Sequence, residues 1–461
     1  MVAELTPGSA TQVAHYQYNQ TISRSLKEVS YLETHRASDA ADLAVSRKPA
    51  QRKFGFSSTF ESLQVRDYRF YFISSLAFMA CMNIQMVASG WFTYKLTGSS
   101  ALLGITLLAN AIPGITFSFF GGTLADKFPK KLIVMLGFLA SGLTVLPIAV
   151  AASFDSVTWQ LLAASSFMQG TVQALMMPSR QAMITEIVGR DKLMNAIALN
   201  SAGMNVNQIG APAIAGFMLA VGGIDGVYYL LTGLYVLAML LAIPITRNTS
   251  TSYASDSEQN QKRSVFGDIK EGLVYVVENK TLLTILLLTF FTVVLSMPFR
   301  MLLPIFTEDV LKVGPERLGI LYSVSGVGAL VGSLFIASIG EQRRGMLFLH
   351  TGLITGVTIF AFSLSHSYTI SLVIMVISGV GQAGRMALSN TLLQSYSDDE
   401  HMGRVMSLFM MQWGVVTLGT FVVSVAAQYV GVQIAVGATG VMLVGMTLYY
   451  YVFSKRVREL N

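Results

Sequence analysis

The chain contains very little charge. Of its 461 residues only 12% are Asp, Glu, Lys or Arg, whereas 53% are hydrophobic. Soluble globular domains carry about 25% charged residues. This composition excludes an ordinary soluble domain and indicates a protein with many membrane-spanning segments.

Groups that commonly carry catalysis or bind metals are scarce as well. Cys81 is the only cysteine, so no disulfide can form within the chain. The predicted spans contain no carboxylate pair, histidine cluster or Ser-His arrangement, and the chain has neither metal-ligand spacing nor a Gly-x-x-x-x-Gly-Lys motif. We therefore expect no cofactor, no metal site, no enzymatic activity and no fused ATP-driven pump.

Acidic residues are missing from the middle of the predicted spans. The nearest ones are Asp126, at the inner end of the second span, and Glu308 and Asp309, at the outer end of the seventh. His350 is the only histidine expected within the bilayer. Coupling to a proton gradient needs a group that titrates at depth, so the sequence leaves open whether a proton or another ion drives the protein.

Long apolar runs follow one another almost without pause from Tyr71 to Phe453. Each is about 20 residues long, the length that a helix needs to cross the hydrocarbon core. Continuous runs of this length favour helices over the alternating pattern of a membrane barrel. The sequence predicts an all-α membrane protein with twelve transmembrane helices, near 69–94, 101–125, 131–153, 158–179, 194–220, 225–246, 281–307, 316–340, 345–365, 369–393, 403–428 and 432–454.

Basic residues gather on one side of these spans, whereas the opposite loops hold little beyond Lys95, Lys312 and Arg317. Under the positive-inside rule the basic side is cytoplasmic. We therefore expect a multi-pass protein of the plasma (inner) membrane, monomeric in the lipid bilayer, with both termini in the cytoplasm. The formal charge of +6 reflects this asymmetry and does not indicate binding to nucleic acid. The basic side carries Lys127, Lys130, Lys131, Arg190, Lys192, Arg247, Lys262, Arg263, Lys270, Arg343, Arg344, Lys455, Arg456 and Arg458.

An internal repeat divides the chain into two parts. Gly170, Gln173, Ala174 and Met177 of the fourth span recur at one constant offset as Gly379, Gln382, Ala383 and Met386 of the tenth. Such a duplication is typical of transporters, in which two halves enclose a central site. The predicted organisation is a disordered cytoplasmic tail at 1–62, a six-helix bundle at 63–247, a cytoplasmic linker with an amphipathic helix at 248–280, a second six-helix bundle at 281–455 and a short cytoplasmic tail at 456–461.

One loop carries a resemblance to a known family. The stretch Gly122-x-Leu124-Ala125-Asp126-Lys127-x-x-Lys130-Lys131 resembles the signature between helices two and three of the major facilitator superfamily, although Pro129 stands where the family usually has glycine. The segments SLQVRDYRFY, PSRQAMITEIVGRDKLMNAIALNS, EGLVYVVENKTLL and ALSNTLLQSYSDDEHMGRVMSL resemble the branch that includes enterobactin exporters and macrolide efflux proteins.

This resemblance implies the two-bundle fold and transport by alternating access. It implies a secondary active transporter that exports a small organic molecule, of siderophore, macrolide or drug type. An importer or a lysophospholipid flippase of the same fold is the alternative. A membrane sensor, a channel or an enzyme fits the repeat less well.

The charged loop predicts a gate on the cytoplasmic side. A carboxylate at Asp126 is favourable beside a helix N-terminus, and the resemblance implies that the start of the eleventh span packs there. Arg404 would add a charge-assisted partner. The alternative is that the lysines only follow the positive-inside rule. The predicted gate consists of Gly122, Asp126, Lys127, Lys130, Lys131 and Arg404.

The resemblance implies that helices one, four, seven and ten border a central cavity. Two arginines on these helices, without a deep acid, favour a substrate with negative charge. The arginines could instead snorkel, the amides could join helices, and the methionines could serve ordinary packing. The predicted cavity residues are Asn83, Gln85, Gln169, Gln173, Met177, Arg300, Gln382, Arg385 and Trp413.

Overall fold

The computed structural model describes residues 60–246, 265–339, 343–398 and 400–460. These residues belong to one compact unit, Phe60–Asn461. The predicted tail, up to its last few residues, and the first part of the predicted linker lie outside the described residues.

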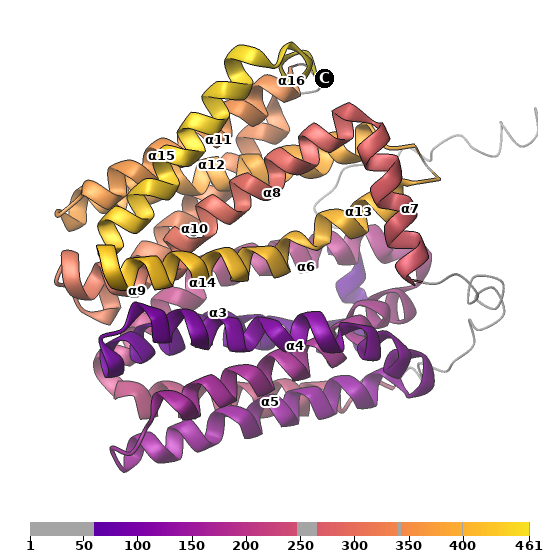
Figure 1. The fold of residues 1–461 in the computed structure, drawn as a ribbon. Coiled ribbons are helices and arrows are strands. Elements are labelled where there is room, and N and C mark those ends of the chain that lie inside the picture. The colour runs from indigo at the N-terminus through magenta and orange to yellow at the C-terminus, as the bar shows by residue number, and fades with distance from the viewer. Residues whose placement is uncertain (1–59, 247–264, 340–342, 399, 461) are drawn as a thin grey trace, which may run out of the picture. The chain divides into compact units, whose positions relative to one another are not determined.

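Helices make up the regular structure of the described residues, which contain no strand. The predicted all-α fold is therefore confirmed (Figure 1). The elements are η1 (Glu61–Gln64), α3 (Arg66–Thr97), α4 (Ser100–Lys127), α5 (Lys130–Ser153), α6 (Trp159–Ala242), α7 (Val265–Glu278), α8 (Lys280–Met301), α9 (Leu303–Ile305), η2 (Phe306–Val310), α10 (Pro315–Ser338), α11 (Arg344–Leu364), α12 (Tyr368–Ser395), α13 (Met402–Met410), α14 (Gln412–Val430), α15 (Val432–Phe453) and α16 (Lys455–Arg458).

Helix α6 contains two sharp turns in its 84 residues. They lie at Gly189 (φ 73°) and Gly223 (φ 66°), where the backbone adopts conformations that residues with a side chain rarely reach. The turns divide α6 into three segments that correspond to the predicted spans four, five and six. Ten helices of the described residues are long and apolar enough to cross a membrane, and one of these, Asp191–Ala242, includes the turn at Gly223.

Polar caps explain where several helices begin. Ser99 accepts a hydrogen bond from the backbone N–H of Leu102 at the start of α4, over 3.3 Å. Asn279 accepts from the first N–H groups of α8, including that of Thr281 over 3.1 Å. These side chains satisfy donors that have no partner within the helix. The caps place the helix starts within a few residues of the predicted ones.

The helices form two bundles, α3–α6 in indigo to magenta and α8–α15 in coral to yellow (Figure 1). Equivalent glycines let helices approach closely in both bundles. A Cβ added to Gly170 would lie 2.0 Å from the backbone oxygen of Asn110 on α4. A Cβ added to Gly379 would lie 2.1 Å from that of Ser325 on α10. Small residues at such contacts are typical of membrane helices.

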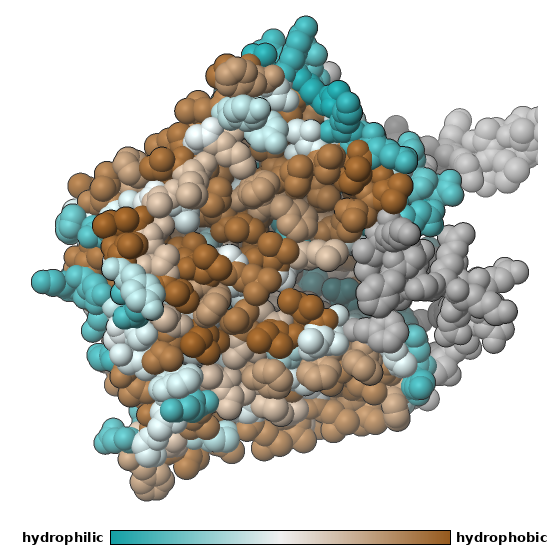
Figure 2. All heavy atoms as spheres, viewed as in Figure 1, coloured by the Kyte–Doolittle hydropathy of each residue, from teal (hydrophilic) through white to brown (hydrophobic). Residues whose placement is uncertain are grey.

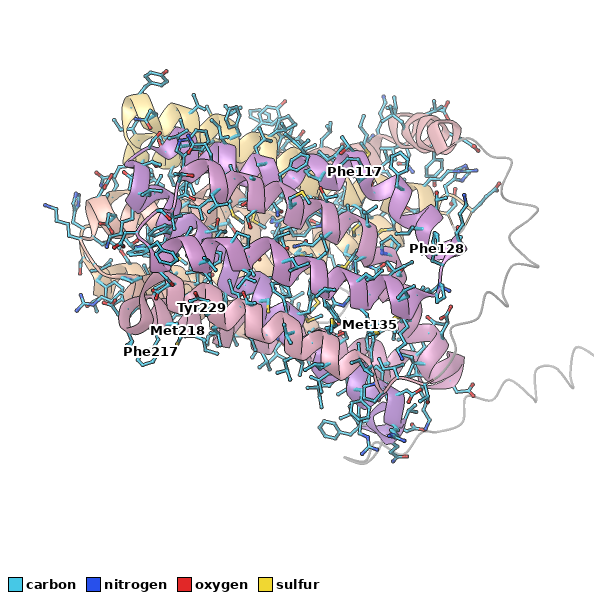
Figure 3. All side chains as sticks on the ribbon, turned by 90° about the horizontal axis from the view of Figure 1, so that it is seen from below. Phe117, Phe128, Met135, Phe217, Met218 and Tyr229 are labelled. Carbon is cyan, nitrogen blue, oxygen red and sulfur yellow. The ribbon has the colours of Figure 1, made fainter. Side chains whose placement is uncertain are left out.

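The surface has an apolar middle and polar ends. In Figure 2 brown spheres cover the middle of the view and teal spheres gather toward its ends. Exposed apolar side chains extend along the first bundle. Figure 3 shows Phe128 at the end of α4, and Phe217 and Tyr229 of α6 toward the opposite end. A water-soluble protein would not expose such a surface, which matches the lipid environment that the composition predicts.

Candidate functional site

A cavity of about 260 Å³ lies between the two bundles. Residues of α3, α4 and α6 form most of its wall, and Met301 of α8 and part of α14 close it from the second bundle. The lining consists of Met82, Gln85, Met86, Ser89, Gly90, Leu103, Thr106, Leu107, Asn110, Ala111, Ser166, Gln169, Gln173, Met301, Val416, Thr417 and Thr420.

The lining of this cavity is largely apolar, with neutral polar groups and no charge among its described residues. Amides and hydroxyls alternate with methionines and leucines, and none of the described lining residues is ionisable. Neutral hydrogen-bonding groups in an apolar wall fix the orientation of a small molecule. Methionine side chains adapt to molecules of different shape.

A chain of hydrogen bonds lies behind the cavity wall. The Tyr235 hydroxyl donates to Gln85 Oε1 over 3.1 Å and accepts from Gln169 Nε2. Gln169 Oε1 lies 3.0 Å from the hydroxyl of Thr144. Tyr235 is fully buried, and only 1% of Gln169 is exposed. The chain joins α3, α5 and two segments of α6, so it stabilises their arrangement around the cavity.

Polar contacts between the bundles close one end of the cavity. The Tyr94 hydroxyl at the end of α3 donates to Asp309 Oδ2 in the π-helical turn after α8. Gln428 of α14 lies at the N-terminus of α4, where its Oε1 accepts from the Ser99 hydroxyl over 2.9 Å and from the Ser100 hydroxyl over 3.3 Å. We call this the closed end.

Backbones also touch at the closed end. A Cβ on Gly216 of α6 would lie 2.4 Å from the backbone oxygen of Pro315, and a Cβ on Gly319 of α10 would lie 2.3 Å from that of Pro212. Only glycine permits helices to approach so closely. The closed end therefore combines hydrogen bonds with direct backbone packing.

The bundles are apart at the other end, which we call the open end. Figure 2 shows a hollow between them there, near α7 and α13 of Figure 1. The gate residues that the sequence predicts lie at this end. Gly122 is half-buried with open space beside it, and Asp126 and Lys127 are exposed. Arg404 forms an ion pair with Glu271 of α7 over 3.0 Å.

The two other predicted gate residues make contacts within the first bundle. Lys130 pairs with Glu186 of α6. Lys131 Nζ donates to the backbone oxygens of Ile243 and Ile245, over 2.7 Å each. The gate contact between Asp126 and Arg404 stays a prediction for a state in which the open end closes.

Helix α7 docks on the start of α13. The ring of Tyr275 stacks on that of His401, with centroids 4.1 Å apart, and its hydroxyl donates to Asp398 Oδ2 over 2.9 Å. A Cβ on Gly272 would lie 2.9 Å from Arg404 Cβ, so the two helices touch there as well. This helix therefore holds the beginning of α13 at the open end.

The structure brings three of the predicted cavity residues, Gln85, Gln169 and Gln173, to one cavity. Met177 follows Gln173 by one helical turn, and Trp413 precedes Thr417 by one turn, so each lies on the same helix face as a lining residue, one turn beyond it. They are 42% and 47% exposed.

Four other predicted residues lie outside this cavity. Asn83 donates to the backbone oxygen of Met79 in its own helix over 2.9 Å. Gln382 is half-buried on α12, and no described residue of that helix lines the cavity. The Arg300 guanidinium lies 5.5 Å from the ring centre of Tyr322. Arg385 belongs to the interior of the second bundle and is only 4% exposed.

The position of Arg385 follows from its neighbours on α12. Ser389, one turn later on the same face, accepts a hydrogen bond from Thr289 of α8 over 3.1 Å. Gly384 packs on Thr351 of α11. Arg385 therefore faces other helices of its own bundle. Its role in substrate recognition stays a prediction.

Sequence reasoning did not identify Tyr235, Thr144, Asn110, Tyr94 and Gln428. Asn110 lines the cavity and donates to the backbone oxygen of Ser166 over 3.0 Å. Its spacing from Leu103, Thr106 and Leu107 on one face of α4 was the available signal. Tyr235 resembles any buried tyrosine in sequence, because its partners lie far away along the chain.

Two six-helix bundles around a cavity that is sealed at one end define a membrane transporter of the alternating-access type. The family model described as "Major Facilitator Superfamily" matches residues 70–420. The chain belongs to this family, whose members are transporters and not enzymes. The resemblance seen in the sequence is thus confirmed.

Named relatives agree with this assignment at low identity. The chain is 21% identical to the staphyloferrin A transporter of Staphylococcus aureus, over 85% of the chain and 97% of the relative. It is 23% identical to an enterobactin exporter of Shigella dysenteriae, over 75% of the chain and 79% of the relative. A bacterial homologue of the human lysosomal transporter Spinster, solved in an inward-facing and unoccupied conformation, shares the fold with a TM-score of 0.66 and 14% identity, over 85% of this chain and 98% of that one.

Proposed function

We propose that this protein is a secondary active transporter that exports a small organic molecule by alternating access. The observation that carries the proposal is the cavity of about 260 Å³ between the bundles, sealed at one end by contacts that cross from one bundle to the other. Those contacts must break for the cavity to open there. The enterobactin exporter among the relatives supports the direction of transport.

The orientation in the membrane forms part of the proposal. The open end carries Lys127, Lys130, Arg344 and Lys455, at the ends of α4 and α15 and the starts of α5 and α11. The positive-inside rule then assigns the open end to the cytoplasm, and with it both termini. An exporter in this state is ready to take up its substrate from the cytoplasm. The plasma membrane is the corresponding location.

Two features of the substrate follow from the wall. Its amides and hydroxyls suit a molecule with several polar atoms, and its methionines suit one with apolar surface. From the sequence, the two arginines predict a substrate with negative charge. Amide donors of the wall would have to bind that charge, because no described lining residue is a cation.

Counterflow in proteoliposomes tests the proposal. We expect vesicles preloaded with substrate to accumulate labelled substrate, because a carrier exchanges molecules across the membrane, whereas a channel only equilibrates them. An imposed pH gradient should increase efflux if protons drive export. Iron-free enterobactin and a macrolide are suitable first probes, given the relatives and the resemblance.

Other outcomes would favour other functions. Accumulation driven only in the inward direction would indicate an importer, and exchange of lysophospholipid without either probe would indicate a flippase. No exchange of any probe would contradict the proposal. Transport by protein at one copy per vesicle would support the predicted monomer.

A further inference from the structure

Tyr235 is the centre of the hydrogen-bond chain behind the cavity. Its hydroxyl is fully buried on the last segment of α6 and reaches two glutamines that line the cavity. It donates to one and accepts from the other, and a phenolic hydroxyl has a single proton to donate. The residue itself does not line the cavity, so it acts through its partners.

We propose that Tyr235 is a positioning residue that orients the Gln85 amide and thereby selects substrates rich in hydrogen-bond acceptors. This inference deepens the proposed transport function and rests on it.

The orientation follows from the direction of the bonds. Because Tyr235 donates to Gln85 Oε1, the amide oxygen points to the buried side. The NH₂ group of Gln85 then points away from Tyr235, on a residue that lines the cavity. Several buried side-chain atoms of the described structure have no hydrogen-bond partner, and the Gln85 nitrogen is not one of these sealed atoms. It is therefore available as a donor of two hydrogen bonds.

Gln169 bonds Tyr235 from the other side. Its nitrogen donates to Tyr235, and its oxygen lies 3.0 Å from the Thr144 hydroxyl, which also lies 2.8 Å from the backbone oxygen of Ser141. Only 1% of this side chain is exposed, so the amide is held by its bonds. Without the tyrosine hydroxyl the Gln85 amide loses its buried partner and can present either its oxygen or its nitrogen to the cavity.

The substrate class follows from this polarity. The N–H donors of Gln85 bind carbonyl, nitro or carboxylate oxygens. They do not pair with a group that only donates, because donors then face each other and remain unpaired, and such a group must use the hydroxyls of the wall instead. The chemistry that fits is an acceptor-rich, oxygen-containing molecule.

Binding to the purified full chain in nanodiscs tests the inference with two probes. Chloramphenicol is neutral and carries nitro and carbonyl oxygens, whereas ethidium has amino donors and no oxygen. We expect the wild type to bind chloramphenicol, and Tyr235→Phe to weaken this binding about five- to tenfold while ethidium binding changes less than about twofold.

A double-mutant cycle separates positioning from general packing. If Tyr235 acts through Gln85, then Tyr235→Phe should cause no further loss of chloramphenicol binding in the Gln85→Leu background. Tyr68→Phe is the matched control. Tyr68 is also fully buried, and its hydroxyl donates to the backbone oxygen of Ala196, which is not among the described lining residues. Its replacement should leave both probes unaffected.

Several results would overturn the inference. They are equal chloramphenicol binding by Tyr235→Phe and wild type, additive losses in the double mutant, loss of ethidium binding instead, and failure of the wild type to bind chloramphenicol. Retained counterflow with other substrates in any of these cases would leave the proposed transport function intact. A protein that binds both probes but shows no counterflow would contradict that function alone.

Discussion

Single residues show how the two bundles differ. Met176 and Arg385 occupy equivalent positions in the repeat, and each faces the interior of its own bundle. Met176 is buried against Gly137 of α5. Arg385 is buried as well, and its Nε has no hydrogen-bond partner among the described residues. A buried guanidinium whose Nε has no partner is costly, so we use this position as a probe of function.

Arg385→Met gives the second bundle the same residue that the first bundle has at the equivalent position, Met176. Since Arg385 lies outside the cavity, we expect substrate affinity within about twofold of wild type and an equal or higher melting temperature. Binding and thermal unfolding in detergent measure both. An apparent KM at least tenfold higher, with normal expression, would instead place Arg385 in the substrate path, as the sequence predicts. Arg385→Lys, which keeps the charge, should then fall between.

Glycine contacts give a prediction about stability. Gly170→Ala would place its Cβ 2.0 Å from the Asn110 oxygen, and we expect overpacking to cost about 1–3 kcal/mol. Gly233→Ala is the control, because Gly233 lies in the same helix with open space beside it. That change should be neutral or stabilising by up to about 1 kcal/mol. Thermal unfolding that ranks the two variants equally would rule out the close contact of α4 and α6.

At the scale of helices, the closed end depends on α14 holding the start of α4. Gln428→Leu removes the acceptor of the Ser99 and Ser100 hydroxyls. The loss of such hydrogen bonds is worth about 1 kcal/mol, which shifts a two-state equilibrium about fivefold. We expect a cysteine at the cavity residue Ser89 to react faster with an impermeant reagent added from the closed end.

A second glutamine provides the control for this experiment. Gln433 of α15 donates to the backbone oxygen of Ser363 over 3.0 Å, a contact within the second bundle. Gln433→Leu should leave the reactivity of the Ser89 position unchanged. If both variants increased it equally, the bond between α14 and α4 would not be what keeps this end closed.

Helix α7 suggests how the open end is held. Glu271 pairs with Arg404 here, whereas Asp126 is the partner that the sequence predicts for the closed gate. The two carboxylates would therefore stabilise opposite states. We expect Glu271→Gln to favour closure of this end and Asp126→Asn to favour opening, each by about 0.3–2 kcal/mol.

Reagent accessibility from the open end measures these two shifts. Glu278→Gln removes the same charge elsewhere on α7 and should have no effect. Shifts of the same sign for Glu271→Gln and Asp126→Asn would show that the carboxylates do not compete for the gate.

At the scale of the whole molecule, much of the fold could be predicted because it depends on local features. Apolar runs define the helices, and the recurring Gly170 and Gly379 mark their repeat. Spacing alone did not predict the break between α13 and α14 at Met411 or the π-helical turn at Phe306–Val310. Such breaks depend on how the helix packs against its neighbours.

The site could be predicted only in part. Gln85, Gln169 and Gln173 lie on helices that border the cavity according to the family resemblance, and the structure brings them to one cavity. Tyr235 and Gln428 act through contacts with distant parts of the chain, which one sequence does not show. Arg385 was expected to face the cavity because it is charged and deep. Depth does not decide which side of a helix faces a cavity.

Alternating access is the central claim, and paired distances across both ends test it most directly. Spin labels at Lys127 and Gly403 report on the open end, and labels at Lys95 and Lys312 report on the closed end; all four residues are exposed. Pulsed electron paramagnetic resonance in nanodiscs, with and without a transported substrate, measures both distances. We predict that the first distance shortens in the same population in which the second lengthens. Distances that stay fixed, or that lengthen together at both ends, would contradict alternating access.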